Sequence, residues 1–254
     1  MKRLNKYLPL AVPLAIFFAL EVYFFYHKLI YPASAFIVIV IIFSLWSFTK
    51  ESQTSKQWWN FAILPALFTL AVISYSTLLE NKPLIQLLFL FDLFFLYFYF
   101  RFSYYYLVKP IAYKVSAIEN LSSYVNFLSY FLIISTIYGL QSYLNIPVWQ
   151  LMVVLAVVSI LAVHQIMWAN KIESKTSNLY LILITLALIE IGWAISFLPL
   201  NFNISGLILA ICYYVIIGLA RLYLLEILDK EKIRLYLIFG IVSLFLVLLT
   251  ARWL

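Results

Sequence analysis

The sequence has few of the charged residues that soluble proteins place on their surfaces. Charged residues make up 11% of the 254 residues, and 66% of the residues are hydrophobic. Soluble domains carry roughly 25% charged residues, and a soluble chain this apolar could not cover its surface with polar groups. The composition therefore excludes an ordinary soluble domain and indicates that lipid surrounds most of the chain.

Residues that bind metals or form disulfides are also scarce. The chain has one cysteine, Cys212, two histidines, and two aspartates, Asp92 and Asp229. A lone cysteine cannot form an intrachain disulfide. Two histidines are too few for most zinc or bis-histidine haem sites, and no aspartate-rich pair is present for a magnesium–diphosphate site. We therefore expect neither a metal nor a cofactor.

Motifs of catalysis and of nucleotide binding are missing as well. The sequence contains no phosphate-binding loop, no His-Glu-x-x-His and no Gly-x-Ser-x-Gly, so the chain does not use ATP through such a loop. The formal net charge of +7 is spread over short segments and forms no long basic tract. We therefore predict no nucleic-acid partner, and membrane lipids or other membrane subunits as partners.

The sequence does contain apolar runs of the length that crosses a bilayer. About 20 residues are needed for a helix to cross the hydrocarbon, whereas barrel strands show alternation over about ten residues. Runs such as Phe36–Trp46 and Leu235–Leu249 do not alternate. We predict an all-α, polytopic transmembrane helix bundle of about nine spans: Tyr7–Tyr26, Leu29–Phe48, Trp58–Leu79, Leu84–Tyr105, Leu121–Leu144, Val148–Trp168, Leu179–Leu198, Ile204–Leu225 and Ile233–Trp253.

The connections predict four hairpins followed by one C-terminal helix. Tight turns after spans one, three, five and seven alternate with more charged connections. Of the 17 Lys and Arg residues, 12 fall on the side of the N-terminus, three on the opposite side and two, Arg101 and Arg221, within spans. This asymmetry predicts a cytoplasmic N-terminus and an external C-terminus in the cell membrane. We expect the first span to remain uncleaved.

No domain boundary is visible, so we predict a single membrane domain over residues 1–254. A weak similarity between 60–110 and 126–172 is either a parallel hairpin repeat or chance similarity in a biased composition. Asn60-Phe61 and Asn126-Phe127 carry it, together with the turns around Pro83 and Pro147.

Six polar residues inside the predicted spans are candidates for an ion or ligand site: Asp92, Glu190, Glu21, Arg101, Arg221 and His164. Charges at this depth cost a few kcal/mol each on insertion scales, so they are where function is expected. A polar cavity is one interpretation, with Asp92 and Glu190 facing the bundle interior. The alternative is structural: arginines that reach the interface, and carboxyls or a histidine that hydrogen-bond between helices.

Aromatic residues are concentrated in the fourth predicted span, between Phe89 and Tyr106. They form either an aromatic groove or a bulky face toward lipid with a belt at Tyr104–Tyr106. Aromatics on all faces cannot line one groove, which favours the lipid-facing interpretation.

These observations leave three functional hypotheses. We favour a non-enzymatic bundle that is transporter-like, lipid-binding or a membrane subunit of a complex. The alternatives are a membrane enzyme that acts on lipid with Asp92 and Glu190 as acid and base, and a purely structural scaffold. The chain offers no catalytic motif to support the second.

The charge asymmetry gives a testable topology. A reporter that is active only outside the cytoplasm, fused after Leu254, is expected to be active, because nine spans place the two termini on opposite sides. The same reporter fused after Lys109, in a predicted cytoplasmic connection, is the matched control and is expected to be silent. Activity of both fusions, or of neither, would contradict the predicted threading.

Overall fold

The computed structural model describes residues 6–51, 58–108, 117–172 and 174–251. In these ranges the regular secondary structure is helical, which confirms the all-α prediction. The elements are α2 (Leu8–Phe25), η1 (His27–Leu29), α3 (Ile30–Glu51), α4 (Trp58–Ser76), α5 (Lys82–Val108), α6 (Ala117–Leu144), α7 (Val148–Ala169), α8 (Ser174–Ile195), α9 (Phe202–Leu224) and α10 (Lys230–Thr250).

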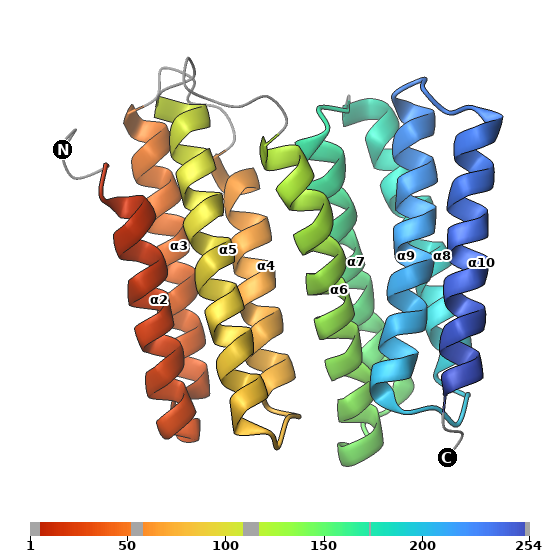
Figure 1. The fold of residues 1–254 in the computed structure, drawn as a ribbon, viewed down its shortest axis with the longest axis horizontal. Coiled ribbons are helices and arrows are strands. Elements are labelled where there is room, and N and C mark those ends of the chain that lie inside the picture. The colour runs from red at the N-terminus through yellow and green to blue at the C-terminus, as the bar shows by residue number, and fades with distance from the viewer. Residues whose placement is uncertain (1–5, 52–57, 109–116, 173, 252–254) are drawn as a thin grey trace. The chain divides into compact units, whose positions relative to one another are not determined.

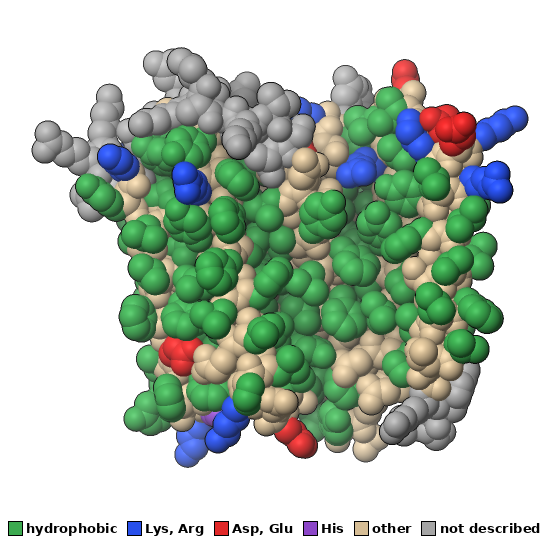
Figure 2. All heavy atoms as spheres, viewed as in Figure 1, with side chains coloured by type: hydrophobic (Ala, Val, Ile, Leu, Met, Phe, Trp, Pro, Cys, Tyr) green, Lys and Arg blue, Asp and Glu red, His purple; other side chains and the backbone are tan. Residues whose placement is uncertain are grey.

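Nine helices in the described ranges are long and apolar enough to span a membrane, as a multi-pass membrane protein requires. Each coincides with a predicted span. Five helices (α5, α6, α8, α9 and α10) begin two to five residues earlier than predicted, most of all α6 at Ala117 and α8 at Ser174. A helix can continue beyond the hydrocarbon into polar residues, which a hydropathy-based prediction leaves out. Hydrophobic side chains cover the middle of the helices, and the charged side chains gather near their ends (Figure 2).

The chain divides into two compact units, residues 1–125 and 126–254, and the boundary falls inside α6. In the first unit, α2 packs against α5 and α3, and α4 packs against α3 and α5, so four neighbouring helices form an antiparallel bundle (Figure 1). Its core includes Ile16 and Leu20 of α2, Ile37 of α3, Phe68 of α4 and Phe89 of α5.

In the second unit, α7 packs against α8, α8 against α9, and α9 against α10 (Figure 1). Side chains of α6 bond to α7, α8 and α9, as described below, and close a second bundle. Among the described residues of α10, only Gly240 is buried, so this helix lies at the edge of its unit. The hairpin repeat stays a prediction, and so does the single membrane domain.

The aromatic helix α5 uses both of its faces. Phe89, Phe95 and Tyr99 are buried in the core of the first unit, whereas Phe91 and Phe94 are exposed. The lipid-facing interpretation is therefore wrong for about half of this helix. Edge-on ring pairs such as Phe68–Phe95, with centroids 4.8 Å apart, are the reason, because they fill the space between α4 and α5.

Side chains and backbone turns complete several helix ends. Asn201 accepts a hydrogen bond from the backbone N–H of Asn203, and Asp229 accepts one from that of Lys232, at 2.9 and 2.7 Å. Both are N-caps. The bond from the Lys232 backbone holds the pKa of the Asp229 carboxyl below its usual value. Asn145 ends α6 with a φ of 52°, a left-handed conformation that asparagine tolerates.

Two glycines of α9 permit close helix contacts. A Cβ on Gly206 would lie 2.9 Å from both the Cα and the backbone nitrogen of Ser135 in α6. A Cβ on Gly218 would collide with the ring of Tyr236 in α10. Glycine at these two positions therefore allows α9 to pack closely against α6 and α10.

Replacing Gly206 with alanine is expected to lower the free energy of unfolding by about 1–3 kcal/mol, because backbone atoms of Ser135 cannot move aside. The matched control is Gly192→Ala. The new Cβ would meet the tip of the Leu155 side chain at 2.8 Å, which can rotate. Thermal unfolding in detergent measures both, and an equal loss in the two variants would refute the backbone contact.

Candidate functional site

Asp92 is fully enclosed in the first unit. It lies in the middle of α5 with 0% of its surface exposed. Thr69 of α4 donates a hydrogen bond to its Oδ1 at 3.0 Å. Its Oδ2 has no hydrogen-bond partner in the described part of the chain. The prediction that Asp92 faces the bundle interior is confirmed. Burying a carboxyl oxygen without a hydrogen-bond partner costs free energy, so packing alone does not explain why an aspartate occupies this position.

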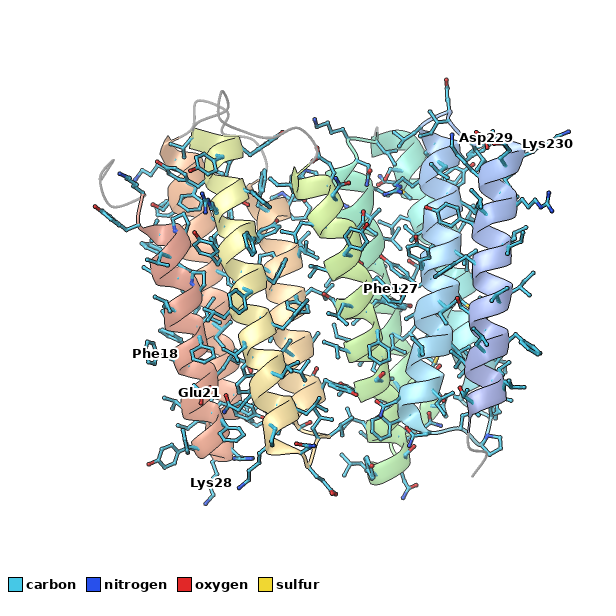
Figure 3. All side chains as sticks on the ribbon, in the orientation of Figure 1. Phe18, Glu21, Lys28, Phe127, Asp229 and Lys230 are labelled. Carbon is cyan, nitrogen blue, oxygen red and sulfur yellow. The ribbon has the colours of Figure 1, made fainter. Side chains whose placement is uncertain are left out.

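Glu21, the second acid of the first unit among the candidates, has a different partner from Asp92. It is half-buried on α2, and Gln86 of α5 donates a hydrogen bond to its Oε2 at 3.2 Å (Figure 3). Since Asp92 bonds to α4 and Glu21 bonds to α5, the two acids do not share a ligand group. Glu21 thus connects α2 with α5, as interhelical polar pairs do in membranes.

The expectation that Glu190 faces the bundle interior is wrong. Its side chain is exposed on α8. The helix is apolar on nearly all sides, so its packing face could not be recognised from the sequence, and the carboxyl lies on the outer face. Asp92 and Glu190 belong to different units, and neither unit by itself contains the acid–base pair that the enzyme hypothesis needs.

The cationic candidates are more exposed than Asp92. Arg101 is exposed on α5, donates a hydrogen bond to the hydroxyl of Tyr97 at 2.9 Å and lies over the rings of Tyr97 and Tyr105. This environment favours the structural interpretation, because an arginine among tyrosines is typical of an interface. Arg221 and His164 are half-buried in the second unit.

The second unit contains a buried polar network that the sequence analysis did not identify. Asn126 of α6 donates to the carbonyl of Ala162 in α7 at 3.0 Å and accepts from the hydroxyl of Tyr213 in α9 at 2.6 Å. Tyr130 of α6 bonds to Ser159 of α7 at 2.9 Å. Its ring stacks on that of Tyr213, with centroids 4.1 Å apart. This Asn126 network joins three helices.

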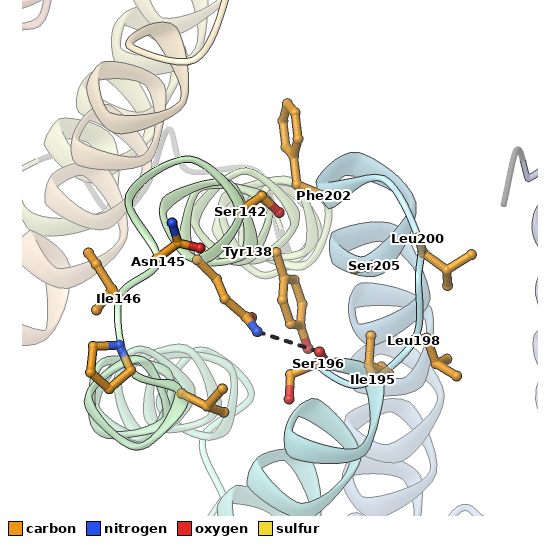
Figure 4. A pocket seen from close by; sticks show the side chains of 13 residues that line it. Tyr138, Ser142, Asn145, Ile146, Ile195, Ser196, Leu198, Leu200, Phe202 and Ser205 are labelled. Carbon is orange, nitrogen blue, oxygen red and sulfur yellow. Dashed lines mark hydrogen bonds between the residues drawn. The ribbon is translucent and has the colours of Figure 1, made fainter. Parts of the chain in front are cut away.

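A pocket of about 320 Å³ opens at the end of the second unit where the α6–α7 and α8–α9 turns lie (Figure 4). Four helix ends surround it. Its lining is Tyr138, Gln141, Ser142, Asn145, Ile146, Pro147, Val148, Ile195, Ser196, Leu198, Leu200, Phe202 and Ser205. This volume is at the lower end of the range for small-molecule sites.

Hydrogen bonds between helices hold the wall of this end pocket. Tyr138 of α6 donates to the carbonyl of Gly192 in α8 at 2.8 Å. Gln141 of α6 donates to the carbonyl of Ser196 at 3.4 Å, the contact drawn in Figure 4. These bonds fix α6 against the end of α8, so the pocket is formed by the fold itself. Both turns could be recognised in the sequence, but their proximity in the fold could not.

Within the described residues, no group of three or more His, Cys, Asp or Glu side chains could hold a metal ion. The end pocket contains no charged side chain among its lining residues. Its chemistry is therefore hydrogen bonding by hydroxyl and amide groups combined with apolar contact.

The comparisons with known proteins give a family and nothing more specific. No curated protein matches the chain. No solved structure matches it either. The family described as "Protein of unknown function (DUF5656)" matches residues 26–251, from the end of α2 to the end of α10. Because this match covers most of the chain and eight of its nine long helices, the protein belongs to the DUF5656 family.

Proposed function

We propose that this protein is a lipid-binding helix bundle of the cell membrane, and that the end pocket receives the polar part of the lipid. The pocket is the observation that carries the proposal. It combines about 320 Å³ of space with hydroxyl and amide groups at one end of an otherwise apolar bundle. Lipids have the same division, with a polar head beside an apolar chain.

The position of the pocket supports a lipid as the ligand. Its mouth lies at helix ends, where Tyr143 of α6 and Trp149 of α7 are exposed. Aromatic residues of this kind are enriched at the level of lipid headgroups. Below the mouth, exposed apolar side chains such as Val153 and Val157 of α7 offer a surface for an acyl chain. With the predicted topology, this end faces the outside of the cell.

Ser142→Trp tests the proposal by filling the mouth. Ser142 is exposed and lines the pocket, so the larger side chain is expected to leave the fold intact. Gln150→Trp is the matched control, because Gln150 is exposed on α7 at the same end but lies outside the lining. Lipid that co-purifies with each protein is measured by mass spectrometry.

We expect Ser142→Trp to retain roughly tenfold less tightly bound lipid than the wild type, the factor that about 1.4 kcal/mol of binding free energy corresponds to. The Gln150→Trp protein is expected to retain as much as the wild type. Equal retention by all three proteins would refute the end pocket as a lipid site.

Asp92 supports a second candidate function, the transport of protons. An ionised Asp92 leaves Oδ2 without a partner in the described residues, and a protonated one leaves its O–H without an acceptor. A carboxyl that lacks a hydrogen-bond partner in either protonation state is suited to exchange a proton. Lone acidic residues within membrane spans commonly mark proton-transfer paths. The enzyme hypothesis lacks a comparable observation.

Proteoliposomes that contain a pH-sensitive dye and carry an imposed membrane potential test this second candidate. Wild-type protein is expected to acidify the lumen faster than empty vesicles, and Asp92→Asn to abolish the difference, because asparagine cannot carry the proton. Thr69→Val is the matched control; it removes the donor to Oδ1 and keeps the carboxyl. Proton flux that is unchanged in Asp92→Asn would refute the candidate.

A further inference from the structure

We infer that the end pocket selects an uncharged, hydroxyl-rich headgroup of the sugar class over a phosphate or any other charged headgroup. This inference rests on the proposed function and names its ligand class. Three features of the pocket support this inference. Its lining has no charged side chain, the partial charges of the helix ends around it offset each other, and its hydrogen-bonding groups include both donors and acceptors.

Charge is the first feature. The chain has 17 Lys and Arg residues and a net charge of +7, yet within the described residues no Lys, Arg, acidic residue or histidine lines the end pocket. Sites for phosphate use arginine, lysine or exposed backbone N–H groups to offset the anion. A charged headgroup that entered this pocket would lose water without gaining an opposite charge.

The helix ends do not supply that charge either. The N-termini of α7 and α9 border the pocket, and each carries a partial positive charge. The C-termini of α6 and α8 border it as well, through Asn145 and Ser196, and carry the opposite partial charge. The two positive and two negative ends offset each other, so the pocket has no preference for an anion.

The same four ends, however, present both donors and acceptors. Helix N-termini offer N–H groups and helix C-termini offer carbonyl oxygens, although the Asn203 N–H already donates to Asn201 and the Ser196 carbonyl already accepts from Gln141. The side chains of Gln141 and Asn145 add an amide each, and Ser142 and Ser205 add hydroxyls. An alcohol donates and accepts at the same oxygen, so a ring of several hydroxyls matches such a mixed lining better than a phosphate, which only accepts.

Aromatic and aliphatic groups complete the match. Tyr138 and Phe202 contribute rings, and Ile146 and Leu198 contribute aliphatic surface (Figure 4). A sugar ring has apolar C–H faces as well as hydroxyl edges, so it can use both kinds of lining. The hydroxyl of Tyr138 already donates to Gly192, which leaves its ring face for apolar contact.

The experiment compares three probes with purified full-length protein in a detergent that carries no sugar, since alkyl glycoside detergents would occupy the site. The probes are a monoglucosyl diacylglycerol, a phosphatidylglycerol with the same acyl chains, and free glucose. Native mass spectrometry gives the bound fraction of each lipid in direct competition, and calorimetry gives the affinity for glucose.

We expect the glucosyl lipid to bind at least about tenfold tighter than the phosphatidylglycerol. Gln141→Leu is expected to reduce that preference at least about fivefold, because it removes the amide at nearly the same volume. Asn145→Gly serves as a second variant. It keeps the left-handed backbone at a φ of 52° and removes only the side chain, so it stays folded even if Gln141→Leu does not. Gln150→Leu, outside the lining, is the control.

The outcomes separate the two proposals. A phosphatidylglycerol bound as tightly as the glucosyl lipid, or a preference untouched by both pocket variants, would overturn the sugar-class inference while the lipid-binding proposal stands. If neither lipid binds, the proposed function fails. If free glucose binds as tightly as the glucosyl lipid, the headgroup chemistry is supported and the lipid assignment is refuted.

Discussion

Backbone hydrogen bonding in a medium that offers no partners is the constraint on which this structure depends. Hydrocarbon cannot satisfy an N–H or a C=O, so each spanning segment must pair its own backbone as a helix. Hydroxyl side chains within the spans also form hydrogen bonds inside their own helix. Ser44 bonds to the carbonyl of Val40 at 2.6 Å and Thr136 to that of Leu132 at 2.8 Å, each four residues back in its own helix. Several hydroxyl side chains are thereby hydrogen-bonded within their own helix, whereas the buried hydroxyls of Ser103, Ser122, Ser135 and Thr185 have no partner in the described residues.

The polar groups that bond between helices are therefore informative. Apolar packing in lipid has little directional preference, because lipid tails resemble leucine. A bond between Asn126 and Tyr213, by contrast, forms only if α6 and α9 have one particular rotation about their axes. The stacked rings of Tyr130 and Tyr213 add the same restriction. The Asn126 network thus fixes how the helices of the second unit face one another, as Thr69 and Asp92 do for α4 and α5 in the first.

Sequence reasoning predicted the spans well because length and hydropathy determine them. It could not predict which side of a span faces inward. Asp92 and Glu190 look alike in the sequence, one acid in the middle of an apolar run, yet one is enclosed and the other exposed. A soluble helix reveals its inner face by a polar outer one, and a helix surrounded by lipid has no such contrast. Tyr130 and Tyr213 were not identifiable among 20 tyrosines for the same reason.

The end pocket could not be predicted from the sequence either. Its residues come from four helix ends that are up to 67 positions apart in the chain, from Tyr138 to Ser205. The individual turns are readable from Asn145 and Pro147, but their convergence depends on how α6 packs against α8 and α9. The glycine at position 206 was the nearest clue, because only a close approach of two helices explains it.

The weak burial of α10 has a consequence for how the chain is made. This helix follows α6 to α9 in the chain and meets neighbours that bond to one another through Asn126, Tyr130 and Tyr138. Its attachment to α9 includes the Tyr236 ring beside Gly218, Gly240 beside Val215, and the rings of Tyr236 and Phe239 against Tyr214. Because α10 takes no part in these bonds, the helices α6 to α9 are held together without it, and α10, which follows its neighbours in chain order, is added along one side of their bundle.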